Sequence, residues 1–210
     1  MSKALPAFLI FGFLVPAAVY AQERLSPIPP EKMTDIQKKT VTEYKQVRKT
    51  DLTAGPFAVL LRDPDYVIPA LEMRLHNLNN SALSRKLTEM AILIAARDWT
   101  NNYEWNAHRR LADEAKLNPA IIDAIAEGRR PERMAEDEEA LYDFCTELLH
   151  NKSISDPTYA RALAKFGEAG VVEAASLEGY YTFLSAVMNT ARTSLPAGAK
   201  PALAPFPANH

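Results

Sequence analysis

The stretch "RDWTNNYEWNAHRR", residues 97–110, places an amide, an acid and an imidazole on one face of a helix. Asn101 precedes Glu104 by three residues and Glu104 precedes His108 by four, and these spacings bring side chains to the same side. A second acid, Glu89, lies in the preceding apolar segment "SRKLTEMAILIAARDW". Histidine titrates near neutral pH and can exchange protons with a carboxylate. These residue types therefore indicate general acid–base chemistry.

The carboxyl group of Glu89 needs polar partners inside the protein, because a helix as apolar as this one is expected to be buried. The nearest polar groups along the chain are those of the Asn–Glu–His row, reached by a tight turn around Trp99–Asn102. We expect all four side chains to converge on one pocket. Glu89, Glu104 and His108 are the candidate catalytic groups, and Asn101 is a candidate substrate contact.

Other side chains of the same stretch are candidates for binding a substrate. Arg97 and Arg109 could hold a substrate carboxylate through charge-assisted hydrogen bonds, and Trp105 and Tyr103 could line the pocket. Each candidate also has a purely structural interpretation. Arginines are often solvated, and a tryptophan often anchors the core. Glu104 and His108, four residues apart, can form a pair on the surface of a helix.

Two carboxylates and one histidine could also bind iron or manganese. The spacing Glu-x-x-x-His is not a diagnostic metal signature, and we expect no metal and no cofactor at this site.

The segments that position these residues have a helical period almost throughout. The chain has 210 residues, of which 48% are hydrophobic, and only seven glycines, which is typical of one soluble domain with a sizeable core. Residues 118–128 predict one short helix, in which Asn118 caps the start, Pro119 occupies the first turn and Gly128 ends the helix. We expect an all-α bundle over residues 32–196, preceded by a Pro-rich lead-in (22–31) and followed by a Pro/Ala-rich tail (197–210).

Residues 1–21, "MSKALPAFLIFGFLVPAAVYA", combine a basic start, a short apolar run and small residues before Gln22. This pattern predicts a secretory signal peptide and an exported, periplasmic or secreted protein. An uncleaved N-terminal anchor is the alternative. No other stretch is long and apolar enough to predict a stable membrane span.

The single cysteine, Cys145, excludes an intramolecular disulfide and a dithiol redox centre, and its apolar helical stripe predicts a core position. The formal charge of -2 argues against nucleic acid as a partner.

Three stretches resemble the carboxymuconolactone decarboxylase family, which shares the fold of the alkylhydroperoxidase D (AhpD) proteins. They are "GPFAVLLRDPDYVIPA", "LTEMAILIAARDWTNNYEWNAHRRLADEAKLNPAIIDAIAEG" and "GYYTFLSAVMNT". The resemblance covers roughly Pro30 to Pro196, and its specific part is the block from Glu89 to Gly128. It implies an AhpD-like helical bundle that assembles as a homo-oligomer, a trimer or a hexamer.

In the peroxidase branch of this superfamily, a glutamate precedes a CxxC motif and a histidine. The resemblance places the glutamate on Glu89 and the histidine on His108, with Asn101 and Glu104 at the two cysteine positions. Without thiols the dithiol reduction of a peroxide is excluded. The resemblance therefore favours the decarboxylase branch: a cofactor-free acid–base lyase acting on a small lactone or organic acid. The alternatives are an alkylhydroperoxidase-like antioxidant protein and a non-catalytic periplasmic protein that binds a small ligand.

Overall fold

The computed structural model describes residues 22–205, and within this range the chain forms helices and no strands, which confirms the all-α prediction. The predicted signal peptide lies outside the described residues. No helix among the described residues is long and apolar enough to cross a membrane. The helices are α1 (Asp35–Arg48), α2 (Gly55–Leu60), α3 (Val67–Asn79), α4 (Arg85–Asp98), α5 (Asn102–Glu114), α6 (Pro119–Ala126), α7 (Glu136–Asn151) and α8 (Asp156–Ala191), with short 3-10 turns at Pro30–Lys32 and Pro64–Tyr66.

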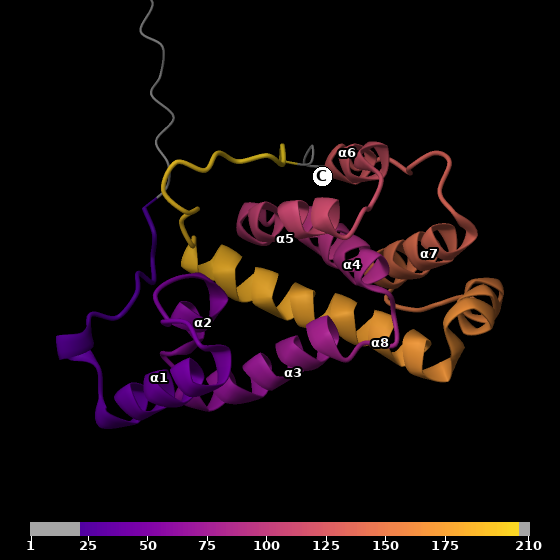
Figure 1. The fold of residues 1–210 in the computed structure, drawn as a ribbon. Helices are drawn as coiled ribbons and strands as arrows, with labels where there is room; N and C mark the ends of the chain where they lie inside the picture. The colour runs from indigo at the N-terminus through magenta and orange to yellow at the C-terminus, as the bar shows by residue number, and fades with distance from the viewer. Residues whose placement is uncertain (1–21, 206–210) are drawn as a thin grey trace, which may run out of the picture.

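Helix α4 lies at the centre of the bundle, where α5, α7 and α8 pack around it (Figure 1). Its residues 87–97 are all buried, so the apolar run that follows Ser84 is covered on every side within one chain. The Ser84 hydroxyl caps the helix by accepting a hydrogen bond from the backbone N–H of Leu87. An acid on this helix is therefore inside the core.

A sharp turn at residues 99–101 folds α5 back against α4. The backbone N–H of Asn101 donates to the carbonyl of Ala96 over 2.8 Å, and Thr100 has a φ of 45°. Because α5 then runs back along α4, a residue two turns into α5 comes level with a residue in the first half of α4. The turn predicted around Trp99–Asn102 is confirmed, and it brings residue 108 next to residue 89.

Helix α8 supplies the wall opposite α4 and consists of two helical halves joined at Gly167, whose φ of 67° interrupts the helix. The positive φ explains why a glycine stands at this joint. The second half runs between α4 and α3 in Figure 1 and packs against α4 and α2. Its inward face carries two tyrosines and a serine, which are described below.

The lead-in and the tail are irregular but are fastened to the bundle. The backbone N–H of Arg24 donates to the carbonyl of Ala191, and the Asn102 side chain accepts from the backbone of Ala202 and Leu203 over 2.8 Å each. The Leu203 side chain is buried in the core. The yellow tail in Figure 1 consequently runs across α5 toward α6.

Candidate active site

Helices α4 and α5 bring two acids and a histidine into direct contact. The Nδ1 atom of His108 lies 2.7 Å from Oε2 of Glu89, and its Nε2 atom lies 3.4 Å from Oε2 of Glu104. The predicted approach of Glu89 to His108 is confirmed. All three side chains are at least nine-tenths buried, and Glu89 has no exposed surface. The imidazole is thus held between two carboxylates away from bulk water.

An arginine extends this cluster to the surface. Arg85, one turn before Glu89 on α4, forms an ion pair with Glu89 in which a guanidinium nitrogen lies 2.5 Å from Oε1, and it donates a hydrogen bond to the carbonyl of Leu78. Its side chain is 40% exposed. The four groups therefore form a continuous row from solvent to core, in the order Arg85, Glu89, His108, Glu104.

The environment of His108 favours its protonated form. Burial alone lowers the pKa of the imidazole, but hydrogen bonds and negative charge from Glu104 and Glu89 outweigh burial, and the pKa of His108 lies above its ordinary value. The ring also meets the edge of Tyr181 on α8, with centroids 5.1 Å apart at 84°. A histidine whose charged form is favoured by two neighbouring carboxylates can donate a proton and take it back.

Asn101 is placed differently from the other members of the predicted row. It is the N-cap of α5: its Oδ1 accepts a hydrogen bond from the backbone N–H of Glu104 over 2.9 Å. Its Nδ2 donates to Oδ1 of Asn189 and to the carbonyl of Ser185 on α8. Asn101 therefore starts the helix and ties it to α8, and its hydrogen bonds do not reach the Glu89–His108 pair. Its predicted role as a substrate contact stays a prediction.

The two candidate arginines have partners away from the cluster. Arg97 is buried and donates to the carbonyl of Ala204 in the tail over 2.6 Å. Arg109 pairs with Asp113 one turn later and lies 3.9 Å from Asp123 on α6. The structure thus brings neither guanidinium to the carboxylate–imidazole row.

The two candidate aromatic residues lie in different surroundings. Trp105 is 3% exposed and belongs to the hydrophobic core. Tyr103 is partly buried and packs so closely over Gly55 that a Cβ there would come within 2.7 Å of its hydroxyl. Tyr103 also lines a hollow of about 380 Å³ between the start of α5 and the end of α8, together with Asn101 and Asn189. Tyr103 is therefore the aromatic candidate that borders open space.

No protein-family model matches the sequence, and no curated protein is significantly similar to it. Among solved structures, the chain is similar to ATU0492 from Agrobacterium tumefaciens, a protein of unknown function suggested to be the antioxidant defence protein AhpD. The two share 15% of their residues with a TM-score of 0.53, over 64% of this chain and 92% of that one. The chain has an AhpD-like helical fold. At this identity the likeness concerns the fold alone.

Sequence reasoning missed two residues at the cluster, Arg85 and Tyr181. Arg85 had a signal, because an arginine four residues before a buried glutamate is placed to pair with it. No sequence pattern indicates Tyr181, because it lies 73 positions from His108 and contacts it only through the packing of α8. Among the described residues, no group of three or more His, Cys, Asp or Glu side chains is arranged to hold a metal ion.

Proposed function

We propose that this protein is a cofactor-free acid–base lyase of the carboxymuconolactone decarboxylase type, acting on a small lactone or organic acid. The observation that carries this proposal is the imidazole of His108, held at its two nitrogens by the buried carboxylates of Glu89 and Glu104. Because the cluster is shielded from water, its charges interact strongly, and a proton placed there can be delivered to a substrate rather than lost to solvent.

The reaction needs a proton where a carboxyl group leaves. When the carbon–carbon bond to the carboxylate breaks, carbon dioxide departs and the electron pair remains on the substrate as an enolate. In our proposal Glu89 holds Nδ1 of His108, so that the Nε2 side, next to Glu104, faces the substrate and supplies the proton to that carbon. Arg85 balances the charge of Glu89 from the solvent side.

The antioxidant alternative draws support from the suggested role of the AhpD-like neighbour. Against it, the chain contains one cysteine, and Cys145 is fully buried in α7. Burial and the neighbouring Glu178 raise the pKa of its thiol well above the ordinary value, which suppresses the reactive thiolate. A dithiol reduction of peroxide has no pair of sulfurs to use.

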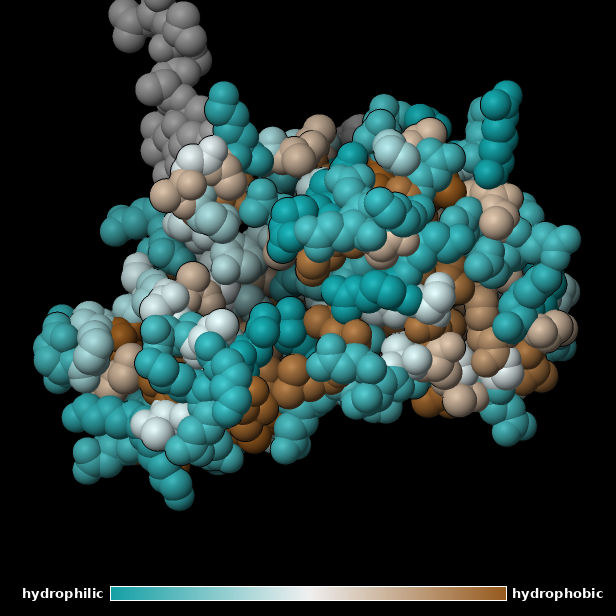
Figure 2. Space-filling model, viewed as in Figure 1, coloured by the Kyte–Doolittle hydropathy of each residue, from teal (hydrophilic) through white to brown (hydrophobic). Residues whose placement is uncertain are grey.

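Export and oligomerisation are also part of the proposal. Export rests on the N-terminal pattern of residues 1–21, and N-terminal sequencing of protein from separated cell fractions tests it. The oligomer is expected from the family resemblance, and the apolar surface of α4 does not contribute an interface because it is covered within the chain. Further support comes from three exposed hydrophobic side chains, Met73 on α3, Tyr66 just before it and Val172 on α8. Hydrophobic side chains gather over α3 in Figure 2. Light scattering at micromolar concentration, with a trimer or hexamer expected, tests this part.

The decisive experiment incubates the purified protein with a panel of lactones and keto acids and detects products by mass spectrometry. We expect loss of carbon dioxide, lowered at least ~10²-fold by Glu89→Gln and by His108→Ala. Glu114→Gln is the control: it removes an exposed acid of α5, the helix that carries His108, and we expect turnover to be unchanged. Binding without turnover would indicate a ligand-binding protein, and peroxide consumption would indicate an antioxidant protein; either result overturns the lyase.

A further inference from the structure

The face of α8 that packs into the core carries two hydroxyl groups without a hydrogen-bond partner among the described residues. They belong to Tyr181 and Ser185, which are 1% and 0% exposed. A spacing of four residues puts both side chains on one side of the helix. Buried hydroxyls are nearly always paired, because an unpaired one loses its bonds to water without replacement. These two hydroxyls are therefore available as hydrogen-bond donors to a ligand that reaches this face of α8.

The preceding tyrosine provides a direct contrast. Tyr180 is also buried, but its hydroxyl donates to the carbonyl of Ala70 on α3 over 2.8 Å. The two rings touch edge to face with centroids 5.2 Å apart. The hydroxyl of Tyr180 is thus part of the bundle's own hydrogen bonding, whereas that of Tyr181 is not.

Packing does not account for the hydroxyl of Tyr181. Its ring is clamped between the rings of His108 and Tyr180, and both contacts would survive in a phenylalanine. The ring contact with His108 places Tyr181 beside the carboxylate–imidazole cluster. Burial, and to a smaller extent the charge of Glu104, raises the pKa of Tyr181 well above its ordinary value, so the phenol keeps its proton at neutral pH.

The chemistry of the two walls determines which ligand atom fits. The wall formed by α4 and α5 carries carboxylates, which repel an oxygen that bears negative charge. The wall formed by α8 offers uncharged O–H donors, which attract such an oxygen. An oxygen that gains charge during a reaction is stabilised by donors fixed in a dry site. A carbonyl oxygen bound here would therefore face α8.

We propose that the hydroxyl of Tyr181, supported by that of Ser185, donates the hydrogen bond that binds the carbonyl oxygen of the substrate and stabilises the enolate formed when carbon dioxide leaves. This assignment rests on the proposed lyase function and specifies the substrate class: a small acid with a lactone or ketone carbonyl next to the carbon that is protonated. No bond to Tyr181 forms or breaks.

The test compares Tyr181→Phe with Tyr180→Phe, the matched control. In thermal melts without ligand, we expect Tyr181→Phe to melt at or above the temperature of the unmodified protein and Tyr180→Phe several degrees below it. A Tyr181→Phe protein that melts as low as the control would mean that the hydroxyl is structural, and would overturn the proposal.

The second measurement is binding of paraconic acid, a stable five-membered lactone bearing a carboxylate, followed by thermal shift. We expect binding to weaken at least ~10-fold in Tyr181→Phe, less in Ser185→Ala, and to stay within twofold in Tyr180→Phe. Equal binding by the unmodified protein and Tyr181→Phe overturns this inference alone. Absence of binding and of turnover in the unmodified protein overturns the lyase function together with it.

Discussion

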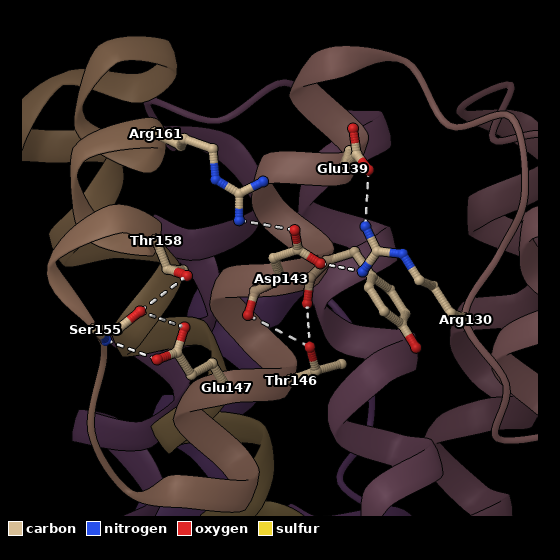
Figure 3. A network of polar contacts seen from close by, with 9 residues as sticks. Arg130, Glu139, Asp143, Thr146, Glu147, Ser155, Thr158 and Arg161 are labelled. Carbon is tan, nitrogen blue, oxygen red and sulfur yellow. Dashed lines mark hydrogen bonds and ion pairs between the residues drawn. The ribbon is translucent and has the colours of Figure 1, made fainter.

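The molecule carries two networks of charged side chains that differ in their access to water. The first is the cluster of Glu89, His108 and Glu104 between α4 and α5, which is buried. The second joins the loop after α6 to α7 and α8: Asp143 accepts from Arg130 and from Arg161, the latter over 2.8 Å (Figure 3). Both arginine side chains are about half exposed.

The two networks have different physical justifications. In the surface network, burial raises the pKa of Asp143, but the hydrogen bonds of Arg130 and Arg161 outweigh burial and lower it below the usual range. Such a network connects three segments while its two arginines keep their contact with water. The buried cluster takes charges out of water, and apolar residues of similar size would often stabilise a fold as well or better. Stability therefore does not account for the buried cluster, which is consistent with the proton transfer that we propose for it.

The largest expected effect follows from breaking the buried cluster at its centre. His108→Ala leaves two carboxylates buried without their shared partner and should lower the free energy of unfolding by about 3–5 kcal/mol in urea at pH 7. Replacing all three groups together, Glu89→Met, Glu104→Met and His108→Leu, should cost much less, because no buried charge remains uncompensated and Arg85, which loses Glu89, is 40% exposed to water. A triple variant as unstable as His108→Ala would contradict the contrast between the two networks.

The pH dependence of His108 has a defined sign. Its folded pKa lies above the unfolded value of about 6.5. The stabilisation from the charged imidazole is therefore fully present below about pH 6.5 and is lost as the pH rises through the folded pKa. NMR titration of the His108 ring should locate this upward-shifted midpoint, and Glu89→Gln should lower it, because it removes one of the two negative charges. A midpoint at or below 6.5 would refute the account.

A third buried acid lies outside both networks. Glu178 on α8 is 1% exposed beside the Cys145 thiol, and burial raises its pKa to about 8. This pKa is above the unfolded value. The stabilisation that the Glu178 carboxyl group contributes is therefore fully present below about pH 4.5 and is lost as the pH rises to about 8. Between pH 4.5 and 7, the free energy of unfolding of the unmodified protein should fall by about 3 kcal/mol more than that of Glu178→Gln. Urea unfolding at both pH values measures this difference, with Glu114→Gln as the control. Parallel pH profiles would contradict it.

Helical periodicity was sufficient to predict the all-α bundle and the contact of Glu89 with His108, since spacing within α5 and the short turn before it leave little freedom. The N-cap role of Asn101 was not predicted, because its spacing to Glu104 fits a cap as well as a shared helical face. The burial of Leu203 and the position of Tyr181 depend on contacts far apart in sequence, which no local pattern encodes.

The smallest expected effect belongs to the surface network. Arg161→Gln removes one of two arginines from Asp143, and Arg130 remains to balance the charge. Exposed pairs contribute little, so the free energy of unfolding should fall by no more than about 1 kcal/mol at 50 mM salt. The difference should vanish near 1 M salt, where the Debye length is about 3 Å. The effect of His108→Ala should persist at both salt concentrations, because the cluster is shielded from ions. If salt erased both effects equally, the distinction between the two networks would fail.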